Sequence, residues 1–252
     1  MNQYLKNLNR IEFVVTMACT GRCKHCSEGE HISDGEHIDG DVAAEAVCEI
    51  CENYNIDSLM TFGGEPLLYP QTVCKIHNAA RSVGIPKREI ITNGYFTKSS
   101  DRIKEVAHML AESGVNGVML SVDAFHQETI PLIYAKEFAQ AILSEQIFIE
   151  VHPAWLVSAE DDNAYNLKTR EHLREFKALG IGVSDGNIIF PSGNAKKYLS
   201  SYFDDNEEYA SPYQENPKDM HAVSFSPNGD VLNGNIYQKS ISEILKTYSP
   251  EK

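Results

Sequence analysis

Short β-like runs alternate with longer amphipathic stretches along most of this 252-residue chain, and this alternation constrains the fold more than any other feature. The β-like runs are 11–16 (IEFVVT), 58–62 (SLMTF), 89–92 (EIIT), 117–122 (GVMLSV), 147–152 (IFIEVH) and 187–190 (NIIF). A strand, a helix and a further strand in succession favour parallel pairing with right-handed crossovers. The pattern therefore predicts an α/β fold, a partial (β/α)6 TIM-like barrel.

Three amphipathic stretches between these runs are expected to be helices. Their apolar stripes are Val47, Ile50, Cys51 and Tyr54, then Val73, Ile76, Ala80 and Val83, then Ile103, Val106, Ala107 and Leu110. Helix-stop signals follow at Gly84, Gly114 and Gly180, and Asp39 or Asp41 is placed to cap the first helix.

The pattern changes after Ala195. Residues 198–221 are rich in Tyr, Asp, Glu and Pro without periodicity and are expected to be a long loop or linker. Strand-like residues 223–226, a turn at 227–229, strand-like residues 230–232 and a short helix over 240–246 complete the chain. We expect a barrel domain over residues 1–197 and a linker with a small hairpin-plus-helix extension over residues 198–252.

Composition narrows the classes of partner and compartment. A formal net charge of −14 weakens any case for nucleic-acid or anionic-membrane binding and favours a cationic or neutral substrate. The first ten residues lack the apolar centre of a signal peptide, and no apolar run approaches membrane-spanning length, so a cytoplasmic location is expected. The six cysteines are bunched before residue 75, which is unlike a secreted disulfide scaffold and favours metal binding or catalysis.

Every predicted strand ends in residues that can carry chemistry. Catalytic groups of such barrels lie where the carboxyl ends of the strands meet. In strand order, these ends carry Cys19, Cys23 and Cys26; Gly63-Gly64-Glu65-Pro66; Thr92-Asn93-Gly94; Ser121 and Asp123; His152-Pro153-Ala154-Trp155; and Pro191-Ser192-Gly193. The sequence therefore predicts a functional site at this mouth.

The three close cysteines allow several interpretations. Their spacing fits one face of a buried helix, although the polar residues around them make a poor core helix. A zinc site completed by His25 or His31 would use the same thiols but would not explain the GGEP segment. A cubane [4Fe-4S] cluster held by three thiolates would keep its fourth iron open for a ligand.

Cys19-x-x-x-Cys23-x-x-Cys26, followed in order by GGEP, TNG and SVD, resembles the radical S-adenosylmethionine (radical SAM) enzymes over residues 10–195. The resemblance implies a [4Fe-4S] cluster on these cysteines, with the methionyl amine and carboxylate of S-adenosylmethionine on the open iron. It also implies an external electron donor such as flavodoxin or ferredoxin, reductive cleavage to a 5'-deoxyadenosyl radical, and hydrogen abstraction from a substrate.

The resemblance also implies roles for other residues. His25 stands where the family often has an aromatic residue against the adenine, and Gly63, Gly64, Glu65 and Pro66 form the segment used for the methionyl amine. Ser121 and Asp123 point to the same face of one strand, where they could bond ribose hydroxyls or the carboxylate, with Asn93 nearby or capping a helix. The candidates for the substrate pocket are His126, His152 and Trp155, each with a purely structural role as the alternative.

The remaining cysteines and the tail are interpreted separately. Cys48, Cys51 and Cys74 fall on predicted helices, and we assign no metal to them. Residues 223–245 are similar to the SPASM or twitch extension, in which cysteines bind auxiliary clusters. Here no cysteine follows Cys74, and Asn233 stands near an expected cysteine position. We expect the tail to close the barrel or shape the substrate opening.

The substrate is the least determined part. The leading hypothesis is a peptide, cross-linked or epimerised as in ribosomal natural products, which the acidic, tyrosine-rich residues 202–213 could meet; that segment could equally be a solvated connector. The alternative substrate is a small metabolite or nucleoside, favoured by the missing auxiliary cysteines. A hypothesis of another class is a non-catalytic iron–sulfur carrier or zinc-binding protein.

Overall fold

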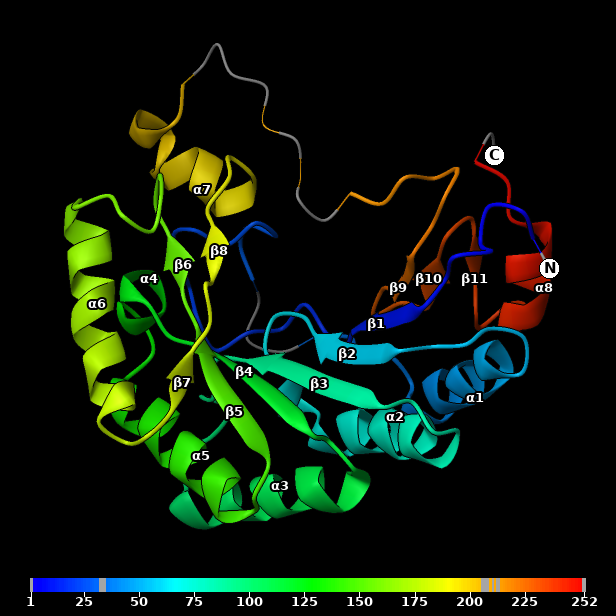
Figure 1. Ribbon diagram of the computed structural model, residues 1–252, viewed down its shortest axis with the longest axis horizontal. Coiled ribbons are helices and arrows are strands. Elements are labelled where there is room, and N and C mark those ends of the chain that lie inside the picture. Colours follow the sequence, from blue (N-terminus) through cyan, green and yellow to red (C-terminus); the bar gives the residue numbers. More distant parts are fainter. Residues whose placement is uncertain (1, 32–34, 205–208, 210, 212–213, 251–252) are drawn as a thin grey trace.

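The computed structural model describes residues 2–31, 35–204, 209, 211 and 214–250. Its centre is a curved sheet of seven strands in the order β7-β5-β4-β3-β2-β1-β9, with every neighbouring pair parallel (Figure 1). The strands are β1 (Arg10–Val14), β2 (Ser58–Phe62), β3 (Lys87–Thr92), β4 (Gly117–Ser121), β5 (Phe148–His152), β7 (Gly182–Val183) and β9 (Ala222–Phe225). The sheet does not close between β7 and β9, so the prediction of a partial α/β barrel is confirmed.

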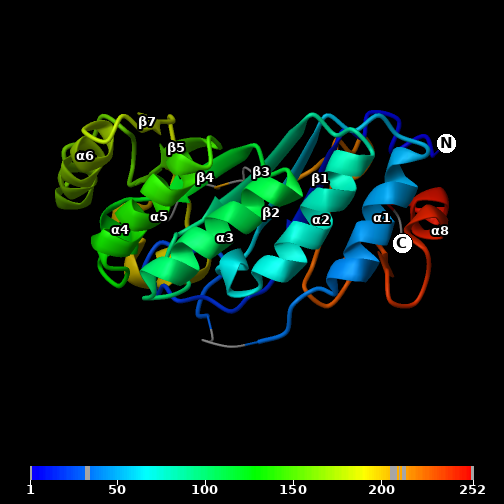
Figure 2. The same ribbon diagram turned by 90° about the horizontal axis from the view of Figure 1, so that it is seen from below.

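Helices cover the outer face of the sheet. The long ones are α1 (Gly40–Cys51), α2 (Pro70–Ser82), α3 (Ser100–Ser113), α5 (Leu132–Ser144) and α6 (Ala164–Lys177). Figure 2 shows α1, α2 and α3 side by side along this face. Short elements lie between strands and helices: η1 (Pro66–Leu68), α4 (Ala124–Gln127), α7 (Gly193–Tyr198) and η2 (Ser200–Tyr202).

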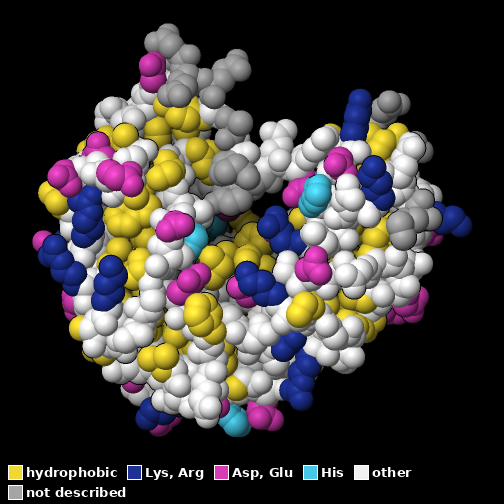
Figure 3. Space-filling model, viewed as in Figure 1, with side chains coloured by type: hydrophobic (Ala, Val, Ile, Leu, Met, Phe, Trp, Pro, Cys, Tyr) yellow, Lys and Arg dark blue, Asp and Glu magenta, His cyan; other side chains and the backbone are white. Residues whose placement is uncertain are grey.

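Side-chain alternation explains why the helices lie on one side only. In β4, Val118 and Leu120 are fully buried beneath the helices, whereas Ser121 is only half-buried. The predicted stripe residues Val47 and Ile76 fill the same layer from the helix side. The space-filling view shows a hollow near the centre of the molecule, inside the curve of the sheet (Figure 3). The inner face is therefore available for ligands.

The sixth strand differs from the prediction. The strand beside β5 is β7, with Glu150 opposite Gly182, whereas residues 187–188 form β8 (Asn187–Ile188) and pair with β6 (Ala154–Trp155) in a separate two-stranded sheet. The physical reason is an interruption of the ladder at Pro153, which has no N–H to donate. Gly186 passes so close to this residue that a Cβ there would lie 2.2 Å from the Pro153 carbonyl oxygen.

The tail contains the predicted hairpin and helix, but its strands pair differently. β9 joins the main sheet beside β1, while β10 (Asp230–Val231) forms the antiparallel hairpin with β11 (Gly234–Asn235). Helix α8 (Ile241–Thr247) follows, capped by the Ser240 side chain. The N-terminal segment packs here too, since Asn2 Nδ2 donates to the Leu245 and Tyr248 carbonyls. The domain division at residue 197 stays a prediction.

Two further predictions concern the linker and membranes. Residues 205–208, 210, 212 and 213 of the predicted linker lie outside the described residues. Among the residues that the structure describes, no helix combines the length and apolar character needed to cross a membrane.

Candidate active site

The three cysteines lie together on the loop that follows β1. This loop is not helical, so the buried-helix interpretation is wrong. Cys19 and Cys23 are each 7% exposed, and a Cβ built on Gly21 would lie 3.6 Å and 3.3 Å from their respective Sγ atoms. The Gly21 amide donates to Cys19 Sγ over 3.3 Å. The backbone between these two cysteines therefore brings their thiols to the same point.

The electrostatics of the three thiols fit a site that needs a metal. Burial raises the pKa of Cys19 to about 12 and that of Cys23 well above its usual value, and it also raises the pKa of Cys26. The charges of Glu65 and Asp123 add to this effect at Cys19 and Cys23 respectively. The thiolate forms become favourable only with positive charge beside them, which bound iron supplies. Three thiols on one loop suit a cluster with one iron free of protein ligands.

The two glycines of GGEP dock the end of β2 against the approach to the cysteine loop. The amides of Gly64 and Glu65 donate to the carbonyls of Thr16 and Ala18, both over 2.8 Å. A Cβ at Gly63 would lie 2.4 Å from the Thr16 oxygen, and one at Gly64 would lie 2.2 Å from the Ala18 oxygen. Only glycine permits this approach, so these positions set the distance between the two segments.

Glu65 links the ends of β2 and β3 from a fully buried position. Its Oε1 accepts from the Leu67 amide (2.9 Å) and Thr92 Oγ1 (2.7 Å), and its Oε2 accepts from the Asn93 amide (2.8 Å). Burial raises its pKa to about 7, although these hydrogen bonds oppose the rise. Pro66 begins η1 directly after it. One acceptor position of Oε2 has no partner among the described residues.

Asn93 contacts the cysteine loop directly. Its Nδ2 donates to Thr20 Oγ1 (3.2 Å) and lies 3.6 Å from Cys19 Sγ, while its Oδ1 accepts from the Tyr95 amide. Helix α3 is capped by Ser99, so the capping alternative for Asn93 is wrong. The structure brings this predicted site residue to the cysteines.

Ser121 and His152 lie opposite each other in the register of β4 and β5. Both alternate with fully buried neighbours, Leu120 and Val151, and therefore face the hollow side of the sheet. His152 Nδ1 lies 2.8 Å from Ser184 Oγ, whereas the Ser121 hydroxyl has no hydrogen-bond partner in the described part of the chain. Ser121 is thus the freer of the two polar groups.

Asp123 does not offer its carboxylate to the mouth as predicted. It is fully buried and caps α4, with Oδ1 accepting from the amides of Phe125 and His126. Its Oδ2 contacts His126 Nδ1 (2.8 Å) and accepts from the Ala154 amide (3.0 Å). Burial alone would raise the pKa of this carboxyl, but the facing His126 and His25 rings and these hydrogen bonds hold it below its usual value. Its acceptor positions are used, so its role is to fix His126.

Three histidines lie beside the cysteines. The His25 ring lies 4.7 Å from the His126 ring and 5.1 Å from the Phe125 ring, between centroids, and burial lowers its pKa to about 4. One donor atom each from Cys23, His25 and His126 lies within 4.8 Å of the others, and His31 Nε2 lies 3.0 Å from Cys26 Sγ. Both histidines of the zinc alternative, His25 and His31, thus adjoin a thiol. Metal analysis therefore distinguishes a zinc site from an iron–sulfur cluster.

Trp155 belongs to the core instead of the pocket. It is buried within the cluster around β3, β4 and β5, and its Nε1 donates to the Asp185 carbonyl over 2.8 Å. The packing alternative therefore explains this residue.

Comparison with known proteins decides the family. Residues 13–149, more than half of the chain, match the Radical SAM superfamily. This chain belongs to the radical SAM superfamily. It is accordingly an enzyme that binds S-adenosylmethionine, and membership implies an iron–sulfur cluster and a reductant. The hypothesis of a non-catalytic protein is wrong.

Relatives and structural neighbours span most of the chain. A probable GTP 3',8-cyclase of Saccharolobus islandicus (strain L.S.2.15 / Lassen #1) is 24% identical over 257 residues, covering 99% of this chain and 78% of the relative. Native anSMEcpe with bound AdoMet has a TM-score of 0.61 at 15% identity, covering 96% and 81% of the two chains. Streptococcus suis SuiB bound to S-adenosylmethionine has a TM-score of 0.58 at 12% identity, covering 97% and 66%. These likenesses show a shared fold.

One residue that holds the radical SAM cysteine loop, Asn194, was not singled out from the sequence. Asn194 donates from its amide nitrogen to the Cys26 carbonyl (2.9 Å) and from Nδ2 to the Cys23 carbonyl (3.1 Å). Ser192 Oγ donates to the Ser27 carbonyl over 3.1 Å. The only sequence signal was the Pro191-Ser192-Gly193 turn after a predicted strand, which gave no reason to single out Asn194.

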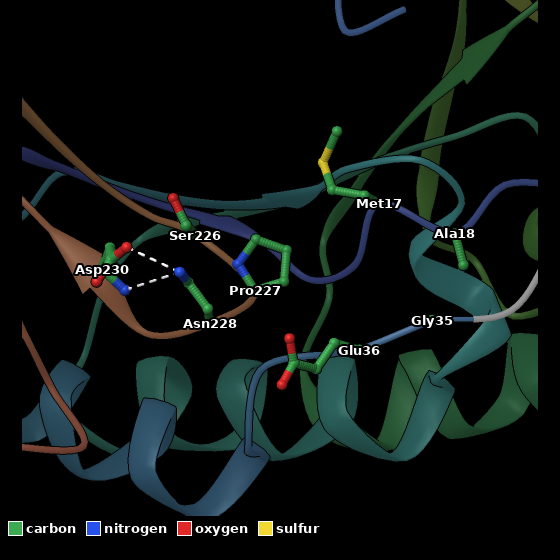
Figure 4. Close-up of a pocket in the computed structure, with 8 residues that line it drawn as sticks. All are labelled: Met17, Ala18, Gly35, Glu36, Ser226, Pro227, Asn228 and Asp230. Atoms are coloured by element: carbon green, nitrogen blue, oxygen red, sulfur yellow. Dashed lines mark hydrogen bonds between the residues drawn. The ribbon is translucent and has the colours of Figure 1, made fainter. Parts of the chain in front are cut away.

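A pocket of about 420 Å³ opens beside the radical SAM loop, where β1 and β9 end. Figure 4 shows residues of the tail on one side and Met17, Ala18 and Glu36 on the other. Its charged groups are the carboxylates of Glu36 and Asp230; hydrogen bonds from Asn235 and Asn228 lower the pKa of Asp230 and keep it anionic. The complete lining is Met17, Ala18, Gly35, Glu36, Ser226, Pro227, Asn228 and Asp230.

Proposed function

We propose that Cys19, Cys23 and Cys26 hold one [4Fe-4S] cluster in an enzyme that abstracts hydrogen from a peptide substrate. The observation that carries this proposal is the convergence of the three cysteines, of which Cys19 and Cys23 are buried, with the docked GGEP segment at one end of the sheet. When bound, the cluster and S-adenosylmethionine supply electron transfer from a flavodoxin- or ferredoxin-like donor, carbon–sulfur cleavage and a 5'-deoxyadenosyl radical.

The chain's own residues bind and orient the cofactor in this proposal. The carbonyls of the Gly63-Gly64 segment and the spare acceptor position of Glu65 Oε2 suit a methionyl ammonium. The neutral His25 ring offers a flat surface for the adenine, and the Ser121 hydroxyl is free to bond a ribose. Asp123 serves by holding His126.

The charges around the pocket favour a substrate with cationic side chains. The pocket presents Glu36 and Asp230, and the chain carries a net charge of −14. Basic groups near the cysteine loop are already engaged: Arg22 donates to the Cys19 and Gly21 carbonyls, Lys24 pairs with Glu128, and Lys197 pairs with Glu30. A basic peptide fits this arrangement better than a triphosphate, which needs uncommitted cations.

A nucleotide or other small metabolite is the second candidate. Its support is that relatives described as probable GTP 3',8-cyclases align with up to 99% of this chain. The acidic pocket opposes a substrate that carries a triphosphate. SuiB, of the same fold, has been solved with its precursor peptide SuiA bound, so this fold does accept peptides.

We further propose that the chain divides into a barrel over residues 1–197 and an extension over residues 198–252 that shapes the substrate opening. The position of the 226–230 turn on one wall of the pocket supports this role. A cytoplasmic location, without nucleic-acid or membrane partners, suits reduced thiols and a soluble electron donor.

The cluster proposal is tested by anaerobic reconstitution and metal analysis. We expect about four irons per chain, and 5'-deoxyadenosine when S-adenosylmethionine and a strong reductant are added. Cys23→Ala should abolish both, whereas Cys51→Ala, on the outer helix α1, should retain both. Zinc without iron, or loss of iron in Cys51→Ala, would contradict the assignment.

The substrate class is tested by stimulation of 5'-deoxyadenosine formation. Synthetic peptides containing lysines, matched peptides containing glutamates, and GTP are compared at equal concentration. Only the lysine peptides should stimulate, and Glu36→Gln should raise their KM by about fivefold or more, since it removes one of two pocket charges. Stimulation by GTP alone would replace the peptide proposal with the nucleotide one.

A further inference from the structure

We infer that Asn194 is a positioning residue that sets the shape of the cysteine loop. The inference rests on the proposed function, because it takes Cys19, Cys23 and Cys26 as the cluster ligands. Asn194 is the second residue of α7 and is 7% exposed. It is separated from Cys23 by 171 positions in the sequence, yet its side chain contacts that residue's backbone.

The side chain and backbone of Asn194 together bridge two cysteines. Nδ2 donates to the Cys23 carbonyl over 3.1 Å, and the amide nitrogen donates to the Cys26 carbonyl over 2.9 Å. Each carbonyl also accepts a weaker bond from within the loop: Cys26 to Cys23, and Gly29 to Cys26, both over 3.3 Å. One residue thus fixes the peptide planes beside two of the three thiols, and hence the directions of their side chains.

The approach of the two segments is too close for a side chain at the preceding residue. Gly193 has φ 48°, and a Cβ on it would lie 2.3 Å from the Ser27 oxygen and 2.6 Å from the Cys26 oxygen. On the other side of the loop, the Arg22 amide donates to Thr129 Oγ1 over 3.0 Å. An irregular loop keeps a ligand geometry only when such outside contacts fix it. Asn194 supplies two of these contacts.

Asn194→Asp is the sharpest variant, because it keeps the shape and the backbone bond but removes the side-chain donor. Its carboxylate would face the Cys23 carbonyl, so the loop should loosen around Cys23. In metal-free protein we expect faster hydrogen exchange at amides 23–29. In the reconstituted protein we expect about half the wild-type iron or less, together with a broadened electron paramagnetic resonance (EPR) signal of the reduced cluster.

Asn166→Asp is the matched control. Asn166 is fully buried, and its Nδ2 donates to the carbonyls of Leu156, Ser158 and Asp161, away from the cysteine loop. This variant should lose stability but leave the loop exchange and the cluster signal unchanged.

Ser192→Ala is the second test, because it removes only the bond to the Ser27 carbonyl. It should show the same changes as Asn194→Asp at smaller amplitude, even if the latter folds poorly. Wild-type loop exchange and cluster signal in Ser192→Ala and in any folded Asn194→Asp would overturn the inference. A wild-type protein without an iron–sulfur signal would instead overturn the proposed function, so the two failures are distinguishable.

Discussion

The cysteine loop and the C-terminal tail follow the neighbouring parallel strands β1 and β9, at the same end of the sheet, but different forces hold them. The loop is fixed by polar contacts from segments far from it in the sequence, including Asn194 of α7 and Thr129 after α4. The tail is fixed by apolar packing: Phe225 stacks on Phe13 with 4.5 Å between ring centroids, and Ile241, Ile244 and Leu245 are buried. Loop contacts should therefore govern cofactor geometry, and tail contacts the free energy of unfolding.

The largest stability effect is expected in the tail. Phe225→Ala should lower the free energy of unfolding by about 3–5 kcal/mol, because it removes a fully buried ring from the core shared by β1, β9 and α8. Denaturant titration of the metal-free protein measures this loss. Phe148→Ala is the control, since that side chain is 63% exposed on β5. Lower iron uptake by the folded Phe225→Ala protein than by wild type would contradict this division of roles between the tail and the loop.

Substitutions at two glycines test the contacts that hold the cysteine loop. Gly193 and Gly180 both have positive φ, 48° and 78°, so alanine carries a backbone cost at each. Only Gly193 is crowded, since nothing lies within 4 Å of a Cβ on Gly180. Gly193→Ala should therefore lose about 1–3 kcal/mol more than Gly180→Ala, and it alone should reduce the iron content. Equal iron uptake by the two variants would show that the contacts from residues 192–194 do not shape the cysteine loop.

The smallest effect is a pH dependence at Glu65. Its pKa is raised from 4.5 to about 7 in the folded protein, so the folded state binds this proton more tightly than the unfolded state. The stabilisation that this proton adds to the free energy of unfolding is fully present below pH 4.5 and is lost as the pH rises through 7. In metal-free protein, the fall in urea midpoint between pH 5 and pH 8 should be smaller for Glu65→Gln than for wild type.

Glu160→Gln, at an exposed position, is the control for that pH series and should behave as wild type. An identical pH slope in wild type and Glu65→Gln would show that the link between the β2 and β3 ends does not titrate in this range.

Features that depend on a short stretch of sequence were predicted correctly. Strand β2 was predicted at its observed bounds, and the cysteines do gather after β1, because alternation and loop spacing are properties of short segments. The sixth strand was misplaced because the ladder beside β5 is interrupted at Pro153, so that residues 182–183 and 187–188 pair in two separate sheets. The pairing of β9 with β1 joins segments far apart in the sequence, and no local pattern specifies such a partner.

The site was likewise predicted only where it depends on residues close together in the sequence. Residue types and order pointed to the cysteines, GGEP and Asn93, which the structure places in contact. Asp123 looked like a ligand contact because β4 alone was considered; the short helix α4, which uses its carboxylate, was not foreseen. Asn194 was missed because its proposed role depends on a contact with a residue 171 positions away in the sequence.

The most direct test of the account is the EPR spectrum of the anaerobically reconstituted, reduced protein before and after S-adenosylmethionine is added. An iron left without a protein ligand predicts a [4Fe-4S] signal that shifts on addition, and no such signal in Cys23→Ala. A signal that ignores S-adenosylmethionine, as expected for a cluster with four protein ligands, or zinc as the only metal, would contradict it.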